Sequence, residues 1–128
     1  MQTDIAKLVD ASKAAMESAY APYSNFKVGA VVQGGSGKVY SGCNVENASY
    51  GLSVCAERVA IFKAVSEGEK EIRAIVIANS SGKPAFPCGA CRQVMAEFAG
   101  DEMEILLVSD EGVEKHTLGE LLPNAFRL

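Results

Sequence analysis

The sequence has no excess of basic residues, no long apolar run and no tryptophan, and it contains a single histidine. Its 12 lysines and arginines are outnumbered by 16 aspartates and glutamates, so it lacks the basic surface that binds nucleic-acid phosphates. The longest apolar stretches, Val28–Val32 and Ala74–Ala78, are far shorter than the ~20 residues that span a bilayer. We therefore expect no nucleic-acid partner and no membrane span, and a small molecule as any substrate.

No secretory signal is expected either, because Met1–Asp4 carry no basic flank and no apolar run follows them. We therefore expect a cytoplasmic protein. A reducing cytosol disfavours disulfides, so the four cysteines are expected to bind a metal or to act as reactive thiols.

No internal repeat, low-complexity segment or linker divides the chain, so residues 1–128 are expected to form a single domain. Apolar residues at steps of three and four predict an amphipathic helix in the first twenty residues, with Thr3 as its N-cap and Pro22 beyond its end. Shorter β-rich and helical segments follow. The predicted strands are 26–33, 38–43, 72–79, 104–109 and a short strand after the turn at 110–112, and the further predicted helices are 55–67, 88–98 and 118–122.

This order of elements predicts an α/β fold in three layers, α/β/α, in which helices cover both faces of a mixed five-stranded sheet. Local signals mark three of the connections. The glycines of Gly34–Gly37 predict a hairpin loop, and Gly68 predicts a helix C-cap. Thr117 and Glu120 predict a capping box for the last helix.

Three of the four cysteines lie at the predicted starts of helices. Cys55 opens one helix, and Cys88 and Cys91 form a C-x-x-C pair that opens the next. Unpaired backbone N–H groups and the positive end of the helix macrodipole lower the pKa of a thiol at such a position. Three protein ligands leave the fourth tetrahedral position of Zn²⁺ to water, which is typical of a catalytic site. We therefore expect one Zn²⁺ per chain, bound by these three cysteines.

The remaining cysteine and the histidine are weaker candidates for a fourth ligand. Cys43 ends a predicted strand, where a small core thiol is expected. His116 lies among polar residues, where a solvated side chain is expected. The C-x-x-C pair has two alternative interpretations, a redox pair and a structural zinc site. A redox pair leaves Cys55 without a role, and a structural site requires a fourth protein ligand.

Two charged residues follow Cys55 on the same helix. Glu57 is placed to take a proton from water at the metal, although compensation of the helix dipole is an alternative role. Arg58 lies near the same helix face as Cys55 and is a candidate donor to its sulfur. Such a cation would offset the net negative charge of Zn²⁺ with three thiolates. The alternative for Arg58 is an ordinary surface arginine.

These residues carry a family resemblance. Cys55–Arg58 together with Pro87–Gln93 resembles the signature of zinc nucleoside deaminases, which exists in a histidine form and a three-cysteine form. Four further segments resemble the small homotetrameric cytidine deaminases, and the resemblance then extends from about Ala15 to Phe126. The segments are Tyr20–Ala30, Gly42–Ala48, Phe62–Gly68 and Glu120–Phe126.

The resemblance implies hydrolytic deamination of cytidine and 2′-deoxycytidine to the uridines, with release of ammonia, in pyrimidine salvage. It implies that Asn44 and Glu46 bind the ribose 3′-hydroxyl and that Phe26 packs against the nucleoside. Backbone near Ala56 would fix the polar edge of the substrate. Phe126 would reach the site of a neighbouring subunit in a homotetramer and stack on the pyrimidine.

Several of these roles have simpler alternatives. Residues 44–47 could form only a turn, and Phe26 could belong to the core. By the same resemblance, Gln93 lies beside the zinc site with Arg58, and Tyr23 and Tyr50 lie near the site or an interface, with no individual roles assigned.

Three other functions compete with this one. A deaminase of a different aminopyrimidine nucleoside would share the zinc centre, but Asn44 and Glu46 favour an ordinary ribose. Deamination of nucleic acid is disfavoured by the acidic composition. A zinc-stabilised binding module without turnover would not require Glu57 beside the metal.

Overall fold

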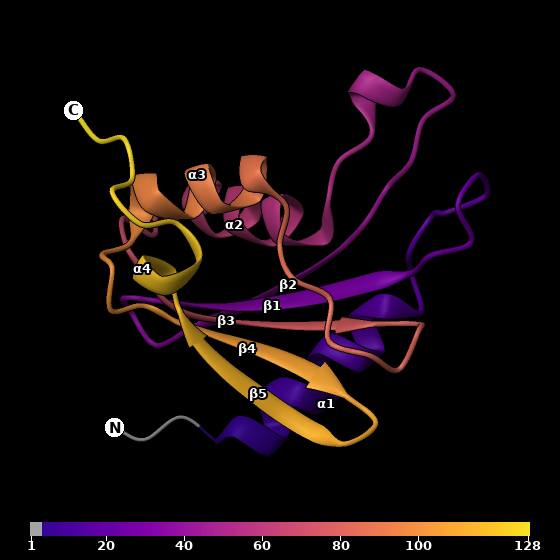
Figure 1. The fold of residues 1–128 in the computed structure, drawn as a ribbon, viewed down its shortest axis with the longest axis horizontal. Helices are drawn as coiled ribbons and strands as arrows, with labels where there is room; N and C mark the ends of the chain where they lie inside the picture. The colour runs from indigo at the N-terminus through magenta and orange to yellow at the C-terminus, as the bar shows by residue number, and fades with distance from the viewer. Residues whose placement is uncertain (1–3) are drawn as a thin grey trace.

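The computed structural model describes residues 4–128, which form three layers (Figure 1). A sheet in the order β2-β1-β3-β4-β5 separates α1 (Ile5–Met16) from α2 (Ala56–Ser66), α3 (Gly89–Phe98) and α4 (Leu118–Leu121). Strands β3 and β4 are parallel and all other neighbours are antiparallel, so the predicted α/β/α fold with a mixed five-stranded sheet is confirmed. The strands are β1 (Val28–Gly34), β2 (Val39–Cys43), β3 (Ile72–Asn79), β4 (Glu104–Ser109) and β5 (Gly112–Thr117).

The sheet is buried on both faces because successive side chains of its central strands point to opposite layers. Ile75 and Ile77 of β3 belong to the core that includes α2 and α3, whereas Val76 and Ala78 pack with Leu8 of α1. None of the helices in residues 4–128 has the length and apolar character needed to cross a bilayer.

The first helix differs from its prediction at both ends. Asp4 is its N-cap and accepts a hydrogen bond from the backbone N–H of Lys7 at 3.4 Å, while Thr3, predicted there, lies outside the described residues. The helix ends at Met16, before the end of the predicted apolar stripe at Ala19. A turn then leads to Pro22, which cannot continue a helix.

Two glycines let helices approach the two faces of the sheet closely. A Cβ at Gly29 would lie 2.1 Å from the backbone oxygen of Ser12 in α1. A Cβ at Gly42 would lie 2.6 Å from the backbone nitrogen of Ala60 in α2. Because any larger residue at Gly42 would collide with helix backbone, this contact sets the distance between β2 and α2.

The strand predicted at 26–33 begins only at Val28. The side chain of Asn44 takes the place of strand pairing just before it: Nδ2 donates to the carbonyl oxygen of Phe26 at 2.8 Å, and Oδ1 accepts from the N–H of Val28 at 2.9 Å. Asn25 has a φ of 56°, in the left-handed region, which interrupts extended backbone. Phe26 is therefore a loop residue.

The predicted connections are confirmed. Gly37 in the β1–β2 loop and Gly68 after α2 have φ values of 92° and 106°, which favour glycine. At the start of α4, Thr117 Oγ1 accepts from the N–H of Glu120 at 3.3 Å. A short 3₁₀ helix, η1 (Tyr50–Leu52), was not predicted; it lies in the loop between β2 and α2, which projects beyond the helix layer in Figure 1.

Candidate active site

Three loops meet at one end of the sheet, where β1 begins and its antiparallel neighbours β2 and β3 end. The loops are 20–27, 44–55 and 80–88, and the last two lead into the N-termini of α2 and α3. Backbone hydrogen bonds join the first two, from Tyr20 N–H to Asn44 at 3.0 Å and from Glu46 N–H to Tyr20 at 2.8 Å. The carboxyl ends of strands are the usual ligand sites of α/β sheets.

The three predicted metal ligands lie together at the two helix starts. Cys55 and Cys88 are the N-cap residues of α2 and α3, and Cys91 lies in the first turn of α3. The Sγ atoms of Cys55 and Cys88 are 3.8 Å apart, those of Cys88 and Cys91 are 3.3 Å apart, and all three lie within 4.8 Å of one another. Over residues 4–128, neither Cys43 nor His116 belongs to this cluster.

The donor set fits zinc. Zn–S bonds of ~2.3 Å at tetrahedral angles separate two sulfurs by roughly 3.8 Å, close to the observed spacing. Hydrogen bonds from Cys91 and then Arg58 outweigh burial and lower the pKa of Cys55 to about 5. The pKa of Cys91 is raised, first by its hydrogen bond to Cys55 and then by burial. The cluster is thus prepared to concentrate negative charge on sulfur at a point where two helices begin.

Glu57 lies beside this cluster in the first turn of α2. It is only 5% exposed and lines a cavity together with Cys55 and Cys88. Burial raises the pKa of Glu57 to about 7, so the carboxyl group can both hold and release a proton near neutral pH. Compensation of the helix dipole alone would not require this burial at a cavity wall.

Arg58 is not an ordinary surface residue. Its Nη2 donates to Cys55 Sγ at 3.5 Å, and its Nε is buried without a hydrogen-bond partner. The guanidinium group therefore faces the sulfur cluster, as expected for a cation that offsets thiolate charge.

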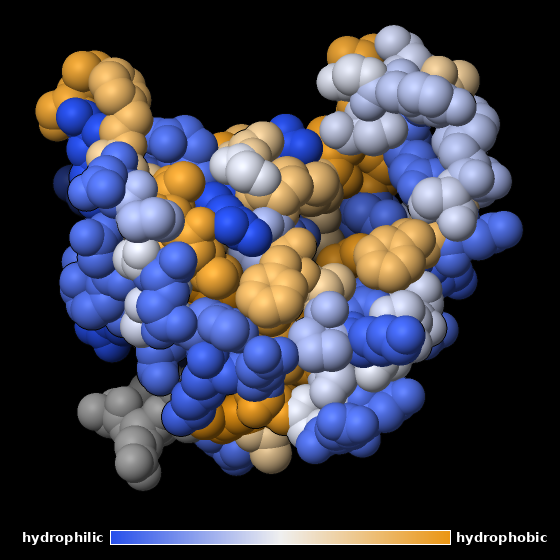
Figure 2. Space-filling view, viewed as in Figure 1, coloured by the Kyte–Doolittle hydropathy of each residue, from blue (hydrophilic) through white to orange (hydrophobic). Residues whose placement is uncertain are grey.

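The cavity has a volume of about 260 Å³, just below the range of common ligand pockets, and it brings together the predicted substrate residues Phe26, Asn44, Glu46 and Ala56. Figure 2 shows apolar side chains gathered around a hollow beneath the projecting loop. Phe26 is partly exposed there, which excludes a core role. The other lining residues are Ser24, Val28, Cys55, Glu57, Ile77, Ala85, Phe86 and Cys88.

Asn44 and Glu46 shape the loop before β1 as well as lining the cavity. Glu46 Oε1 accepts from the N–H groups of Tyr23 and Ser24 at 2.9 and 3.1 Å, and Oε2 accepts from the Ser24 hydroxyl. These hydrogen bonds, led by the one from the hydroxyl, lower the pKa of Glu46. A carboxylate has about four lone-pair sites and an amide has two N–H groups, so both side chains keep capacity for a ligand.

Two further residues of the site were not found from the sequence. Arg92 donates from Nε to the carbonyl oxygen of Pro87 at 2.7 Å and from Nη1 to that of Leu121 at 2.6 Å, which holds the turn before Cys88. In the sequence, only its position next to the C-x-x-C pair marks Arg92 as a residue of the site. Phe86 lines the cavity, and its sequence context gave no signal.

Gln93 and Phe126 do not line the cavity of their own chain. Gln93 Nε2 donates to the carbonyl oxygen of Phe126 at 2.9 Å and so holds the C-terminal segment against α3. Phe126 is 70% exposed. In Figure 1 this segment and the projecting loop of η1 lie at opposite ends of the helix layer.

Two expectations were wrong. Cys43 is partly exposed at the end of β2 and belongs to neither core cluster, because the strand ends at the rim of the sheet. The His116 side chain is only 18% exposed instead of solvated, because it packs on Phe86 and lies between the carboxylates of Glu114 and Glu120.

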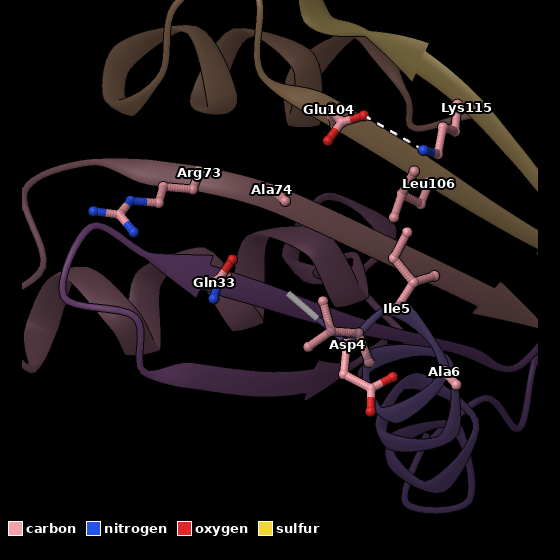
Figure 3. Close-up of a pocket in the computed structure, with 10 residues that line it drawn as sticks. Asp4, Ile5, Ala6, Gln33, Arg73, Ala74, Glu104, Leu106 and Lys115 are labelled. Atoms are coloured by element: carbon pink, nitrogen blue, oxygen red, sulfur yellow. Dashed lines mark ion pairs between the residues drawn. The ribbon is translucent and has the colours of Figure 1, made fainter. Parts of the chain in front are cut away.

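A larger cavity, of about 700 Å³, lies on the other face of the sheet (Figure 3). It is lined by the N-terminal turns of α1 and by charged residues of the central and edge strands, of which Glu104 and Lys115 pair with each other at 3.9 Å. It contains no cysteine and shares no residue with the cavity at Glu57, so the chemistry of the cluster lies elsewhere.

Comparisons with known proteins agree with this geometry. Residues 2–107 match the family described as the cytidine and deoxycytidylate deaminase zinc-binding region. The chain is 47% identical over 124 residues to a cytidine deaminase of Sporosarcina psychrophila, covering 96% of this chain and 91% of the relative. It is 50% identical over 113 residues to one of Halalkalibacterium halodurans, covering 88% of this chain and 86% of that relative.

Solved structures give the same result. The crystal structure of a cytidine deaminase from Burkholderia pseudomallei superposes with a TM-score of 0.90 at 50% identity, covering 98% of this chain and 100% of that one. The cytidine deaminase of Mycobacterium tuberculosis gives a TM-score of 0.86 at 39% identity, covering 99% and 100%. With its cysteine cluster in the matched zinc-binding region, this chain belongs to the cytidine deaminase family.

Proposed function

We propose that the protein is a zinc-dependent cytidine deaminase that converts cytidine and 2′-deoxycytidine to uridine and 2′-deoxyuridine with release of ammonia. The observation that carries this function is the placement of Glu57 and two of the three clustered cysteines on the wall of the cavity that also holds Asn44 and Glu46. The reacting pyrimidine ring and the sugar of one nucleoside could thus be bound in the same cavity.

Cys55, Cys88 and Cys91 would hold the zinc ion, which when bound activates water for attack at neutral pH. Glu57 takes a proton from the attacking water and delivers it to N3 of the pyrimidine. It carries the second proton to the amino group at C4, which leaves as ammonia, so water and cytidine are converted to uridine and ammonia in balance. Its buried position keeps bulk water from competing for these protons.

The rest of the cavity is suited to a nucleoside. The start of α2 at Ala56 presents backbone to the polar edge of the ring, and Asn44 and Glu46 offer donors and acceptors to the ribose 3′-hydroxyl. Phe26 supplies an apolar wall. Cys55, Cys88 and Cys91 must stay unoxidised to hold a metal, and a reducing compartment favours this, which supports a cytoplasmic enzyme of pyrimidine salvage.

The proposed activity can be tested with the purified holoenzyme. Ultraviolet absorbance should fall with cytidine and with 2′-deoxycytidine, and cytosine should be a much poorer substrate because it cannot use Asn44 and Glu46. A zinc chelator should abolish turnover, and added zinc should restore it. Lack of turnover with both nucleosides at full zinc occupancy would contradict the proposal.

Replacement of the general base should separate chemistry from metal binding. We expect Glu57→Gln to keep its zinc and to lose at least ~10⁴-fold in kcat, because one carboxyl group performs two proton transfers. Metal analysis and initial rates measure the two effects. Glu97→Gln, at an exposed position of α3, is the matched control and should behave as the wild type. A Glu57→Gln enzyme with more than about a tenth of wild-type turnover would exclude the role.

The contact between Arg58 and Cys55 predicts an effect on the metal site. Arg58→Ala should weaken zinc retention or activity by about 10- to 100-fold, because the sulfur loses a cationic donor. Competition with a chelator gives the zinc affinity. Arg73→Ala removes an exposed arginine of β3 and should change neither property. Equal zinc affinity and equal turnover in all three proteins would exclude the role of Arg58.

Phe126 supports a homotetramer in which neighbouring chains complete each site. Phe126 is 70% exposed and Gln93 holds its backbone, and both features suit a contact with another subunit. Further apolar side chains are exposed on the projecting loop, including Tyr50 and Leu52. These surfaces would be covered in an oligomer.

Hybrid oligomers can test whether Phe126 acts in a neighbouring site. Loss of ring stacking in Phe126→Ala should raise KM about tenfold. Coexpression with Glu57→Gln should restore a component of wild-type KM, because Phe126 of the otherwise inactive chain would complete a site whose own Glu57 is intact. Light scattering should report the mass of a tetramer. Hybrids showing only the KM of Phe126→Ala, or a fully active monomer, would exclude a contribution in trans.

A further inference from the structure

Phe86 has an unusual position in the cavity wall. It immediately precedes the Pro87–Cys88 turn, so its backbone adjoins a predicted zinc ligand, and its side chain lines the cavity. The residue is 49% exposed, so part of the ring is not covered by the chain itself. The ring is therefore available to a bound molecule.

The ring of Phe86 packs against the imidazole ring of His116, which lies in β5. The two ring centroids are 5.0 Å apart, and the planes are tilted by 58°, a favourable arrangement for an aromatic pair. Carboxylate oxygens of Glu114 and Glu120 lie 3.2 Å from Nε2 and 3.5 Å from Nδ1 of His116, and Nε2 is buried without a hydrogen-bond partner among the described residues. The imidazole, whose side chain is only 18% exposed, therefore packs between the Phe86 ring and these two carboxylates.

This contact matters because residues 84–86 lie between two anchored carbonyl groups, those of Lys83 and Pro87. Asn79 Nδ2 donates to the carbonyl oxygen of Lys83 at 2.7 Å, and Arg92 Nε donates to that of Pro87 at 2.7 Å. Within residues 4–128, no hydrogen bond is formed by the backbone of 84–86. The ring contact with His116 is therefore a support for the Phe86 side chain in this stretch.

We propose that Phe86 is a contact residue for the pyrimidine ring of the nucleoside and that His116 is its positioning residue. This inference rests on the proposed deaminase function. The cavity has one end at Cys55, Glu57 and Cys88, where the ring must react, and another at Asn44 and Glu46. Phe86 is two residues before Cys88 in the chain and so lies at the reactive end of the cavity. Its ring would therefore contact the pyrimidine and not the sugar.

Kinetics of single and double variants test the proposal in the zinc-loaded enzyme. Phe86→Ala should raise KM about tenfold, equally for cytidine and 2′-deoxycytidine, with kcat changed by less than about twofold and zinc retained. His116→Ala should raise KM by about three- to fivefold, because the phenyl ring remains but loses its support. In the double variant, KM should equal that of Phe86→Ala alone, because His116 acts only through Phe86.

Two more variants separate positioning from a general effect on stability. His116→Phe keeps an aromatic ring against Phe86, so its KM should be near the wild-type value and not raised as in His116→Ala. Lys115→Ala removes the neighbouring side chain of β5, which pairs with Glu104 and does not line the cavity at Glu57. This substitution should leave KM unchanged.

Each contrary result has a distinct meaning. An unchanged KM in Phe86→Ala excludes the contact with substrate, and a loss of zinc together with kcat at constant KM shows that Phe86 only supports the Cys88 turn. Effects of the two substitutions that multiply in the double variant exclude the positioning role of His116. Absence of turnover in the wild type contradicts the proposed function, whereas an active wild type with these results contradicts only the inference about Phe86 and His116.

Discussion

The position of the three sulfur atoms depends on bringing the N-termini of two helices to the same end of the sheet. Two helix N-termini that face each other concentrate partial positive charge, which thiolates are suited to balance. The contact of Gly42 with α2 sets one helix close to β2, and the hydrogen bonds of Arg92 hold the turn that starts the other. The metal centre is thus a consequence of how α2 and α3 pack, and the cavity lies where their starts leave the sheet uncovered.

The charges around the sulfur atoms also help to explain the raised pKa of Glu57. The carboxyl group is buried beside groups that carry negative charge, and both conditions oppose its ionisation, burial being the larger. Arg58 acts in the opposite direction, because its guanidinium group contacts Cys55 and stabilises negative charge on sulfur. The same small region therefore favours an ionised sulfur and a carboxyl group that exchanges its proton near neutral pH. A general base that must both accept and release protons requires this balance.

Most of the fold could be predicted because its signals are local. Periodicity and capping residues identified all the main helices and strands, and helix starts identified the cysteine ligands. The start of β1 was misplaced because the Asn44 side chain, contributed by a loop after the next strand, pairs with Phe26 and Val28. The support of Phe86 by His116 was missed for the same reason, since no local pattern reports a contact between residues 30 positions apart. The metal-site cysteines and Glu57 were thus more predictable from the sequence than the residues that hold them in place.

Asn44 and Glu46 both order a loop and line the cavity, so the proposed binding of a nucleoside would use side chains that the fold already positions. Glu46 gathers the N–H groups of Tyr23 and Ser24, and Asn44 fixes the backbone on both sides of Lys27, so the loop before β1 is ordered before any ligand arrives. A site formed in advance loses less conformational entropy on binding. Both side chains line the cavity and keep hydrogen-bonding capacity beyond the bonds that they form within the chain. If the proposed ribose contacts form, loss of either side chain would remove one of them and also loosen the backbone at Phe26. The affinity for a nucleoside should then depend on Asn44 and Glu46 more strongly than a single hydrogen bond to ribose would explain.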